Sequence, residues 1–273
     1  AFTSFAALSG CKEKKKEPEL KRYDAQFLDL FDTVTSIVGY SQDEETFTAY
    51  AQELYDQLKI YHQLYDIYNE YEGIANIKTI NDQAGIAPVQ VDQRIIAMLK
   101  EAVDMYEKTD GYMNVAMGSV LSVWHEYRTE GIDDPENARL PSMEELKAAA
   151  EHTDISQVVI DEDASTVYLP DKDMSLDVGS IAKGYAAEMA CRKLEEDGLA
   201  YGLVSVGGMC GPSGQKPTAA CGRWGFRILI CPAIKATFIP WSLKICPWLP
   251  AVPIRGIIRL TAKRTTILST RSF

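Results

Sequence analysis

One stretch of the sequence combines a carboxylate, a glycine turn and a lysine at a spacing that suits anion binding. It reads SLDVGSIAKGYAAE and spans residues 175–188. We expect a strand to end at Asp177, a tight turn at Gly179 and a helix to begin directly afterwards, with Lys183 about one turn into it. The first amides and the positive dipole end of a helix favour phosphate or another anion. The spacing matches neither a P-loop nor a dinucleotide fingerprint, so a plain strand, turn and helix with a surface lysine stays open.

Four other stretches carry residues that could join the same site. DGYMNVAMGSVLSVW (110–124) links a glycine turn to small and sulfur-bearing residues, and EGIANIKTIN (72–81) closes a long helix before a polar turn. FDT (31–33) lies within an expected strand, and SVGG (205–208) ends another. Taken alone, residues 110–124 are equally compatible with packing in the core.

The elements that must position these stretches form a mixed order, which predicts the α+β fold class. Residues 26–40 alternate apolar and polar side chains and are rich in β-branched types, so they predict one strand. A helix should follow, with Ser41 at its cap and apolar residues at helical spacing as far as Tyr71; its tyrosines are expected to pack against the core. Further helices are expected at 91–111 (ended by Gly111), 142–151 (capped by Ser142) and about 180–196, a hairpin at 157–170, and a strand at 203–206.

The bulk composition limits the function classes. The chain has 273 residues, 46% of them hydrophobic, which is enough for one large domain or two small ones. A net charge of -11 argues against a nucleic-acid binder. The charge is divided unevenly, because residues 209–273 hold ten Lys and Arg and no Asp or Glu. The same residues hold four of the six Cys, seven of the twelve Pro and three of the four Trp.

The first residues resemble a targeting signal. A short run of apolar and small residues leads to Leu8-Ser9-Gly10-Cys11 and then to a lysine cluster, which resembles a bacterial lipobox. We therefore expect residues 1–24 to be the remnant of a lipoprotein signal and a polar tether, with a lipid on Cys11. This predicts a domain anchored by its lipid to the outer face of the bacterial cytoplasmic membrane. An ordinary cysteine near the N-terminus is the alternative.

Five stretches in order, namely FDT, the loop ending in Asn81, DGYMNVAMGSVLSVW, LDVGSIAKGYA and VSVGG, resemble the FAD:protein FMN transferases of the ApbE type. The resemblance covers about residues 25–208. That family uses Mg²⁺ to cleave FAD and attaches FMN through a phosphoester to Thr or Ser of a partner protein. The resemblance implies a mixed sheet with flanking helices, FAD as substrate, and an acceptor flavoprotein subunit of an electron-transfer system. The implied site residues are FAD contacts at Phe31, Met113, Asn114, Val115, Asp177, Lys183, Gly207 and Gly208, and a Mg²⁺ ligand from the backbone carbonyl of Ser180.

The tail departs from the family pattern. Residues 209–273 contain no Asp and no His, so the family's later D-x-x-x-T metal segment and its H-x-x-D-P base motif are absent from them. Shifting the reading frame by one base permits family-like strings in the expected order, and residues 260–273 then permit DGKKYHHIIDPEF. We therefore interpret 209–273 as a frameshifted continuation and not a native domain. We expect the chain to be poorly folded after Gly208 and inactive, and its four tail cysteines to form neither selected disulfides nor a zinc site.

Two other functions stay open from the sequence. An extracytoplasmic flavin-binding lipoprotein without transferase activity needs only the first four motifs. A basic tail that binds a membrane or a polyanion is the other, and the absence of amphipathic periodicity in the tail counts against it.

Overall fold

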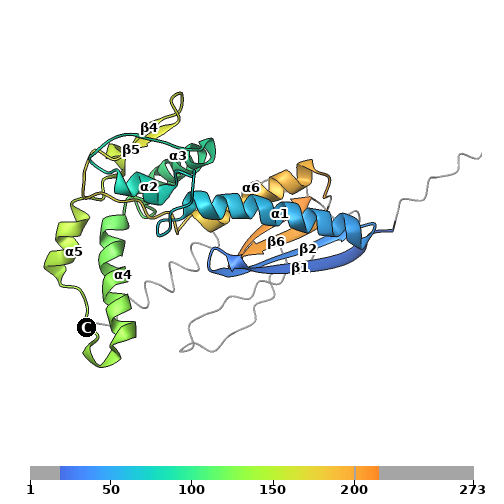
Figure 1. The fold of residues 1–273 in the computed structure, drawn as a ribbon, viewed down its shortest axis with the longest axis horizontal. Helices are drawn as coiled ribbons and strands as arrows, with labels where there is room; N and C mark the ends of the chain where they lie inside the picture. Colours follow the sequence, from blue (N-terminus) through green and yellow to red (C-terminus); the bar gives the residue numbers. More distant parts are fainter. Residues whose placement is uncertain (1–18, 200, 215–273) are drawn as a thin grey trace, which may run out of the picture. The chain divides into compact units, whose positions relative to one another are not determined.

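The computed structural model describes residues 19–199 and 201–214, all of which lie in the first of the two units into which the chain divides, residues 1–215. Helices and strands alternate irregularly along these residues, which confirms the α+β prediction (Figure 1). The predicted lipobox at Cys11 and residues 215–273 lie outside the described residues. Within the described part, no helix combines the length and the hydropathy that a membrane crossing requires.

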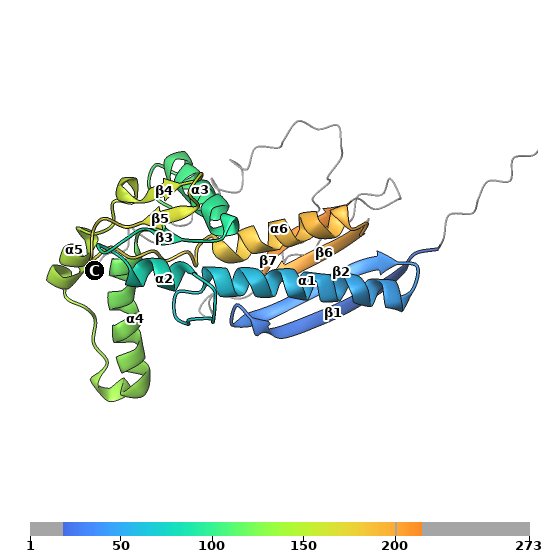
Figure 2. The ribbon, with the colours of Figure 1, turned by 45° about the horizontal axis from the view of Figure 1, so that its top comes forward.

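The larger sheet has four antiparallel strands in the order β1-β2-β6-β7. Its strands are β1 (Lys21–Leu30), β2 (Thr33–Ser41), β6 (Tyr201–Val206) and β7 (Met209–Gly214). Two helices that are far apart in sequence, α1 (Glu44–Tyr65) and α6 (Ala182–Glu196), lie side by side on one face of this sheet (Figures 1 and 2). The sheet therefore brings the start of the chain next to the segment that follows Asp177.

The prediction of one strand over residues 26–40 is wrong, because a hairpin turn at Phe31 and Asp32 divides it into β1 and β2. Both turn residues are left-handed, with φ of 56° and 49°, as a tight two-residue hairpin turn requires. The alternation of apolar and polar residues continues through both strands, and Phe-Asp is not the usual Asn-Gly signal. Phe31 and Asp32 of the FDT stretch thus form a turn, and Thr33 begins β2.

The expectation that the chain is poorly folded after Gly208 is wrong for Met209–Gly214, which form strand β7. This strand pairs with β6 in a register that runs from Val206 opposite Met209 to Tyr201 opposite Gly214. The turn between them contains Gly207 and Gly208, with φ of 57° and 88°. Pairing along a sheet edge uses backbone groups, so it requires few particular side chains. The other tail residues lie outside the described part.

Helix α1 begins and ends inside the predicted range. Its N-cap is Asp43, whose side chain accepts an amide hydrogen from the first turn, whereas the predicted cap Ser41 donates its hydroxyl to the Asp43 carbonyl. The helix ends at Tyr65, which is buried, so the predicted packing face of tyrosines ends there too. Tyr68 lies beyond the helix and is 62% exposed, which makes it available to a ligand.

The remaining elements form a second group around a small sheet with the order β3-β5-β4. Its strands are β3 (Val89–Gln90), β4 (Val159–Asp161) and β5 (Thr166–Tyr168). The helices of this group are α2 (Ile77–Asp82), α3 (Gln93–Lys108), α4 (Gly118–Asp133) and α5 (Met143–Ala150), with short 3₁₀ turns at Pro135–Asn137 and Ile155–Gln157.

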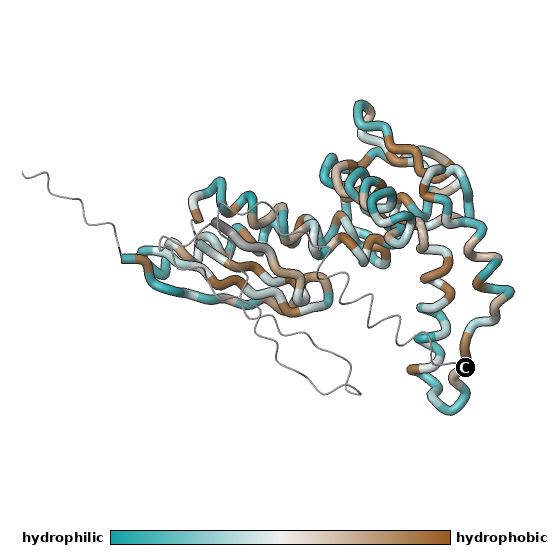
Figure 3. Tube along the Cα trace, turned by 180° about the vertical axis from the view of Figure 1, so that it is seen from behind, coloured by the Kyte–Doolittle hydropathy of each residue, from teal (hydrophilic) through white to brown (hydrophobic). Residues whose placement is uncertain are grey.

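Three predictions for this group are confirmed. The helix ahead of Gly111 is α3, which ends at Lys108; the left-handed residues Asp110 and Gly111 follow its cap, with φ of 52° and 82°, and Gly111 N–H donates to the Tyr106 carbonyl at 2.9 Å. Ser142 caps α5 in a reciprocal capping box with Glu145. Residues 157–170 contain the β4–β5 hairpin. Figure 3 shows hydrophobic residues along the strands of the larger sheet and hydrophilic ones at the tip of this hairpin.

Candidate functional site

A cavity of about 350 Å³ lies where the β1–β2 turn, the end of α1 and the start of α6 meet. Three of the predicted FAD contacts, Phe31, Asp177 and Lys183, line it together. The rest of its lining is Asp32, His62, Tyr65, Asp66, Ile67, Tyr68, Asn69, His125, Val178, Gly179 and Ala182. Aromatic rings and groups of both charges thus surround one hollow, a composition that suits a flat ligand with charged substituents.

The β1–β2 turn is tied to α1 by a histidine. The backbone N–H of Phe31 donates to Nδ1 of His62 at 3.3 Å, and the two rings meet edge to face. The other ring nitrogen, Nε2, lies 3.4 Å from the hydroxyl of Tyr71. Since Nδ1 accepts a hydrogen bond here, the neutral ring carries its proton on Nε2. This arrangement orients the Phe31 turn at the mouth of the cavity.

Asp66 organises the loop that follows α1. Its carboxylate accepts hydrogen bonds from the backbone and side chain of Asn69, from the backbone N–H of Tyr68 at 2.7 Å and from the hydroxyl of Tyr71 at 2.7 Å. Burial raises the pKa of this carboxyl, but the hydrogen bonds outweigh burial and hold the pKa below its ordinary value. Burial and the bond to Asp66 raise the pKa of Tyr71 to about 12. The loop therefore presents Tyr68 on a fixed backbone.

Tyr68 and His125 line the cavity and contact each other. The Tyr68 hydroxyl lies 3.2 Å from Nδ1 of His125, which α4 supplies. Burial and the nearby carboxylates of Asp177, Asp66 and Asp32 raise the pKa of Tyr68, although Arg128 opposes them. The Tyr68 hydroxyl thus stays protonated at neutral pH and remains a hydrogen-bond donor.

The segment that ends at Asp177 belongs to none of the strands, so the predicted strand there is wrong. The side chain of Asn81 makes the hydrogen bonds that a neighbouring strand would otherwise make to this segment. It donates to the carbonyl of Leu176 at 3.0 Å and accepts from the N–H of Leu176 at 2.7 Å. The N–H of Asp177 donates to the carbonyl of Val115 at 2.8 Å. These bonds hold the carboxylate of Asp177 at the cavity, where its Oδ1 also accepts from Gly179 N–H at 2.9 Å.

Helix α6 begins at Ala182, so Lys183 is its second residue and not a full turn inside it. In the described part of the chain, no side chain caps this helix end. The positive end of the α6 dipole and the ammonium group of Lys183 therefore lie at the same corner of the cavity, which favours an anion there.

A close backbone contact fixes the neighbouring helix α4. A Cβ atom on Gly118 would lie 2.5 Å from the carbonyl oxygen of Ser175, and the N–H of Gly118 donates to that oxygen at 3.1 Å. Only glycine allows this approach. The first turn of α4 is thereby held against the segment that leads to Asp177.

The stretch Met113 to Val115 does not line this cavity. Val115 is buried, and its carbonyl accepts the N–H of Asp177, which does line the cavity. Asn114 lines a second hollow of about 500 Å³ together with Tyr106, Tyr112 and residues after α5. The second hollow is the larger, but it contains one predicted contact, whereas the first contains three. We therefore assign the site to the first.

The glycine turn lies beside the Phe31 turn and also does not line the cavity. Gly207 N–H donates to the carbonyl of Val34 at 3.1 Å, and a Cβ on Gly207 would lie 2.9 Å from the Thr33 hydroxyl. Gly208 has open space around it within 4 Å. These two glycines therefore shape the sheet end next to the site.

The Mg²⁺ assignment fits the described residues only in part. Ser180 is exposed in the turn before α6, and its carbonyl is an oxygen of the kind Mg²⁺ prefers. One carbonyl falls short of the several oxygen ligands that Mg²⁺ takes, and among the described residues the three-residue group able to hold a metal lies elsewhere, at His152, Asp171 and Asp173. A Mg²⁺ ion at Ser180 would therefore need further oxygen ligands, which waters and substrate phosphates commonly supply.

The lining residues that were not predicted from the sequence include His62, Asp66, Tyr68 and His125. His62 and Tyr68 were hidden in an apolar helical pattern, and His125 belongs to α4, a helix that was not predicted. The run YDIYNEY, which places several polar residues at the end of a helix, is the sequence feature that could have indicated them.

Comparison with known proteins assigns the family. The ApbE family model matches residues 31–240, so the match continues past Gly208. Similar solved structures are the ApbE protein of Thermotoga maritima MSB8, with a TM-score of 0.60, 27% identity and coverage of 72% of this chain and 60% of that chain, and the flavin transferase ApbE from Vibrio cholerae, with a TM-score of 0.63, 19% identity and coverage of 77% and 64%. The fold is that of an ApbE-like α+β domain. The chain belongs to the ApbE family.

Curated relatives carry a functional name. The chain is 35% identical over 137 residues to the FAD:protein FMN transferase of Treponema pallidum strain Nichols, covering 48% of this chain and 36% of the relative. It is 28% identical over 169 residues to that of Klebsiella pneumoniae strain 342, covering 62% and 49%. The matched part thus spans about a third to a half of these relatives.

Proposed function

We propose that the cavity at Phe31, Asp177 and Lys183 binds FAD, the substrate of FAD:protein FMN transfer. The observation that carries this proposal is that three predicted contacts, from segments far apart in the chain, line one cavity. The curated relatives named FAD:protein FMN transferase support it.

The residues suit the parts of FAD. The pyrophosphate carries about two negative charges, which Lys183 and the N-terminal end of α6 would neutralise. Phe31, Tyr68 and His125 offer ring faces and edges to a flat aromatic group. A volume of about 350 Å³ is near the lower end for ligand sites, so the cavity would hold one portion of FAD while the rest extends along the surface.

The transfer step also requires a base and metal ligands. The acceptor Thr or Ser oxygen would form a bond to the FMN phosphorus while the pyrophosphate bond to AMP breaks, and the hydroxyl proton would pass to a base. Mg²⁺, when bound, neutralises phosphate charge in such chemistry, and Ser180 would supply one ligand. Residues 209–273 contain neither Asp nor His for the remaining roles. We therefore propose that this chain binds FAD without transferring FMN.

The N-terminal motif supports a proposal for localisation. We propose that Cys11 carries a lipid that holds the domain at the outer face of the bacterial cytoplasmic membrane. Its acceptor there would be a flavin-carrying subunit of an electron-transfer system. Metabolic labelling with a lipid analogue, compared between wild type and Cys11→Ala, tests the anchor.

FAD titration followed by flavin fluorescence tests the binding step. Lys183→Met should weaken FAD binding at least about tenfold, because a charge-assisted contact is lost. Lys147→Met, at an exposed lysine on α5, is the matched control and should bind as wild type. Equal affinity in both variants contradicts the assignment of the cavity.

The mass of a Thr-bearing acceptor, incubated with FAD and Mg²⁺, tests the transfer step. We expect no change with this chain and the addition of one FMN with a chain in which the shifted frame after Gly208 is restored. Addition of FMN by the present chain would overturn the proposal of binding alone.

A further inference from the structure

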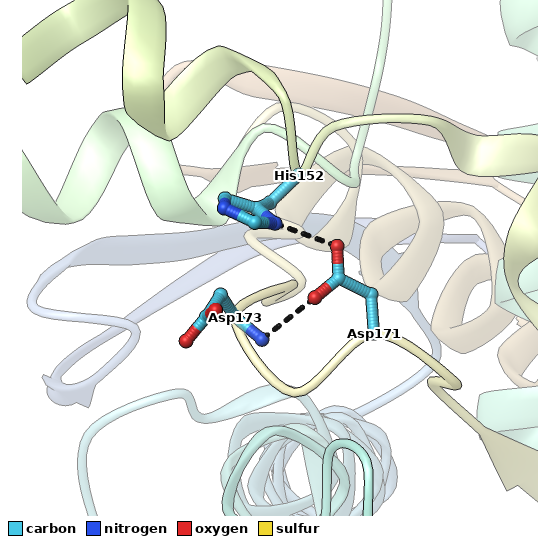
Figure 4. A group of neighbouring side chains, drawn as sticks. All are labelled: His152, Asp171 and Asp173. Atoms are coloured by element: carbon cyan, nitrogen blue, oxygen red, sulfur yellow. Dashed lines mark hydrogen bonds and ion pairs between the residues drawn. The ribbon is translucent and has the colours of Figure 1, made fainter.

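Three potential metal ligands converge outside the flavin cavity. His152 follows α5, and Asp171 and Asp173 lie in the loop after β5. One ligand atom from each residue lies within 4.8 Å of the others. Figure 4 shows the ring of His152 and the carboxylate of Asp171 facing each other, with Asp173 alongside.

The Asp171 carboxylate is already oriented for coordination. Its Oδ1 accepts the backbone N–H of Asp173 at 2.9 Å, so its Oδ2 faces Nδ1 of His152 at 2.6 Å. Two donor atoms that share an ion at 2.0–2.2 Å lie about 3 Å apart at a right angle, so a small adjustment would let both bind one ion. A proton now holds these two atoms together at the place an ion would occupy.

The loop that carries both aspartates is held in place from several sides. Leu169 and Met174 bracket it and are 1% and 2% exposed. Gly85 packs directly on it, since a Cβ on Gly85 would lie 2.9 Å from the Cα of Lys172, and Gly85 N–H donates to the Leu169 carbonyl at 2.7 Å. A preformed backbone lowers the cost of ordering ligands when an ion binds.

The local charge favours a divalent cation. The two carboxylates carry two negative charges, and Asp173 pairs with the ammonium of Lys172 at 2.9 Å. Lys172 is 79% exposed in its side chain, so this ion pair is weak and can yield to an ion. A mixed set of imidazole and carboxylates suits Zn²⁺ and its first-row neighbours better than Mg²⁺, which prefers oxygen alone.

We propose that His152, Asp171 and Asp173 form a binding site for a divalent transition-metal ion of the Zn²⁺ class, with water completing its coordination. The ion would join the end of α5 to the loop that continues through Met174 and Ser175 to Asp177. It is separate from Ser180, the expected source of a Mg²⁺ ligand. Its role would be to stabilise this connection.

Spectroscopic titration of the full chain with Co²⁺, in excess Mg²⁺, tests the site. We expect one Co²⁺ per chain, with d–d absorption and without a thiolate charge-transfer band, and displacement by Zn²⁺. His152→Gln and Asp171→Asn should each weaken binding at least about tenfold. Asp163→Asn, on the exposed hairpin tip, is the matched control and should bind as wild type.

Several outcomes would overturn the proposal: no binding at millimolar Co²⁺, unchanged affinity in the ligand variants, or a thiolate band that assigns the ion to cysteines. Asp173→Asn is a further ligand variant for the case in which the other two misfold. The Asp173 side chain is 49% exposed and pairs with Lys172 on the surface, so its replacement should leave the fold intact. Thermal unfolding gives an independent readout, because Zn²⁺ should raise the Tm of wild type but not of His152→Gln.

Discussion

The backbone N–H of Phe31 donates a hydrogen bond to Nδ1 of His62, which lies 31 residues later in the chain. The two rings also meet edge to face, with centroids 5.4 Å apart. Phe31 has a φ of 56°, a conformation that costs a non-glycine residue about 1–3 kcal/mol. His62 therefore helps to maintain a strained turn at the mouth of the candidate flavin cavity.

Removing the acceptor on His62 should loosen this turn. We expect His62→Leu to weaken FAD binding about tenfold, because the Phe31 N–H loses its partner. His62→Asn places a carbonyl oxygen near the position of Nδ1 and should recover most of the affinity. FAD titration of both variants checks this, and equal losses in the two would show that packing, and not the hydrogen bond, positions Phe31.

Replacing Asn81 should lower the free energy of unfolding more than replacing a surface asparagine. Asn81→Ala deletes both bonds to Leu176 and leaves that N–H and carbonyl without partners, which we expect to cost about 2 kcal/mol of unfolding free energy. FAD affinity should fall as well, because Asp177 is the next residue. Asn137→Ala, at an exposed turn, is the control and should change stability little. Urea unfolding measures both, and similar costs would contradict the argument.

Two glycines of α4 offer a matched comparison. Gly118→Ala would force a methyl group into the Ser175 backbone, so we expect a loss of about 1–3 kcal/mol in stability. At Gly131, near the other end of the helix, the nearest atom is an alanine methyl 3.3 Å away. Gly131→Ala requires only a small shift of that methyl, which helix propensity offsets, so it should cost far less than Gly118→Ala. Thermal unfolding of the two variants tests this; a stable Gly118→Ala protein would show that α4 can shift.

Local patterns predicted the elements whose signals are contained in a few residues. The α5 cap at Ser142, the end of α3 before Gly111 and the β4–β5 hairpin all follow from capping and turn chemistry within one short stretch. The β1–β2 turn was missed because Phe-Asp is not a usual hairpin signal and Phe31 adopts a φ that its residue type disfavours. His62 and the paired sheet maintain that conformation, and neither is visible in a local window.

The candidate site was predictable only where a residue's type carries its chemistry. Lys183 and Asp177 follow from charge and a turn, and the structure places both at one cavity. Tyr68 and His125 meet only because α4 and the loop after α1 lie together, which depends on the contact of Gly118 with Ser175. Such contacts between distant segments have no local sequence signal.

The loop that presents Tyr68 should weaken in acid. Hydrogen bonds hold the pKa of Asp66 below its ordinary value of 3.8, so its carboxylate contributes stability above that value. The contribution is lost as pH falls through the lowered pKa. Asp66→Asn should therefore be less stable than wild type at pH 6, with the difference shrinking below pH 4. Urea unfolding over this range measures it, and a difference independent of pH would show that the charge of Asp66 plays no part.

Two cysteines should differ sharply in reactivity. Burial raises the pKa of Cys191 to about 12, so at pH 8 only about one thiol in ten thousand is the reactive thiolate. Cys210 is exposed on β7. We expect iodoacetamide to label Cys210 in the native protein and to reach Cys191 only after unfolding in urea, as followed by peptide mass spectrometry. Labelling of Cys191 at the rate of Cys210 under native conditions would mean that α6 opens from the sheet readily, which its packing over β6 and β7 opposes.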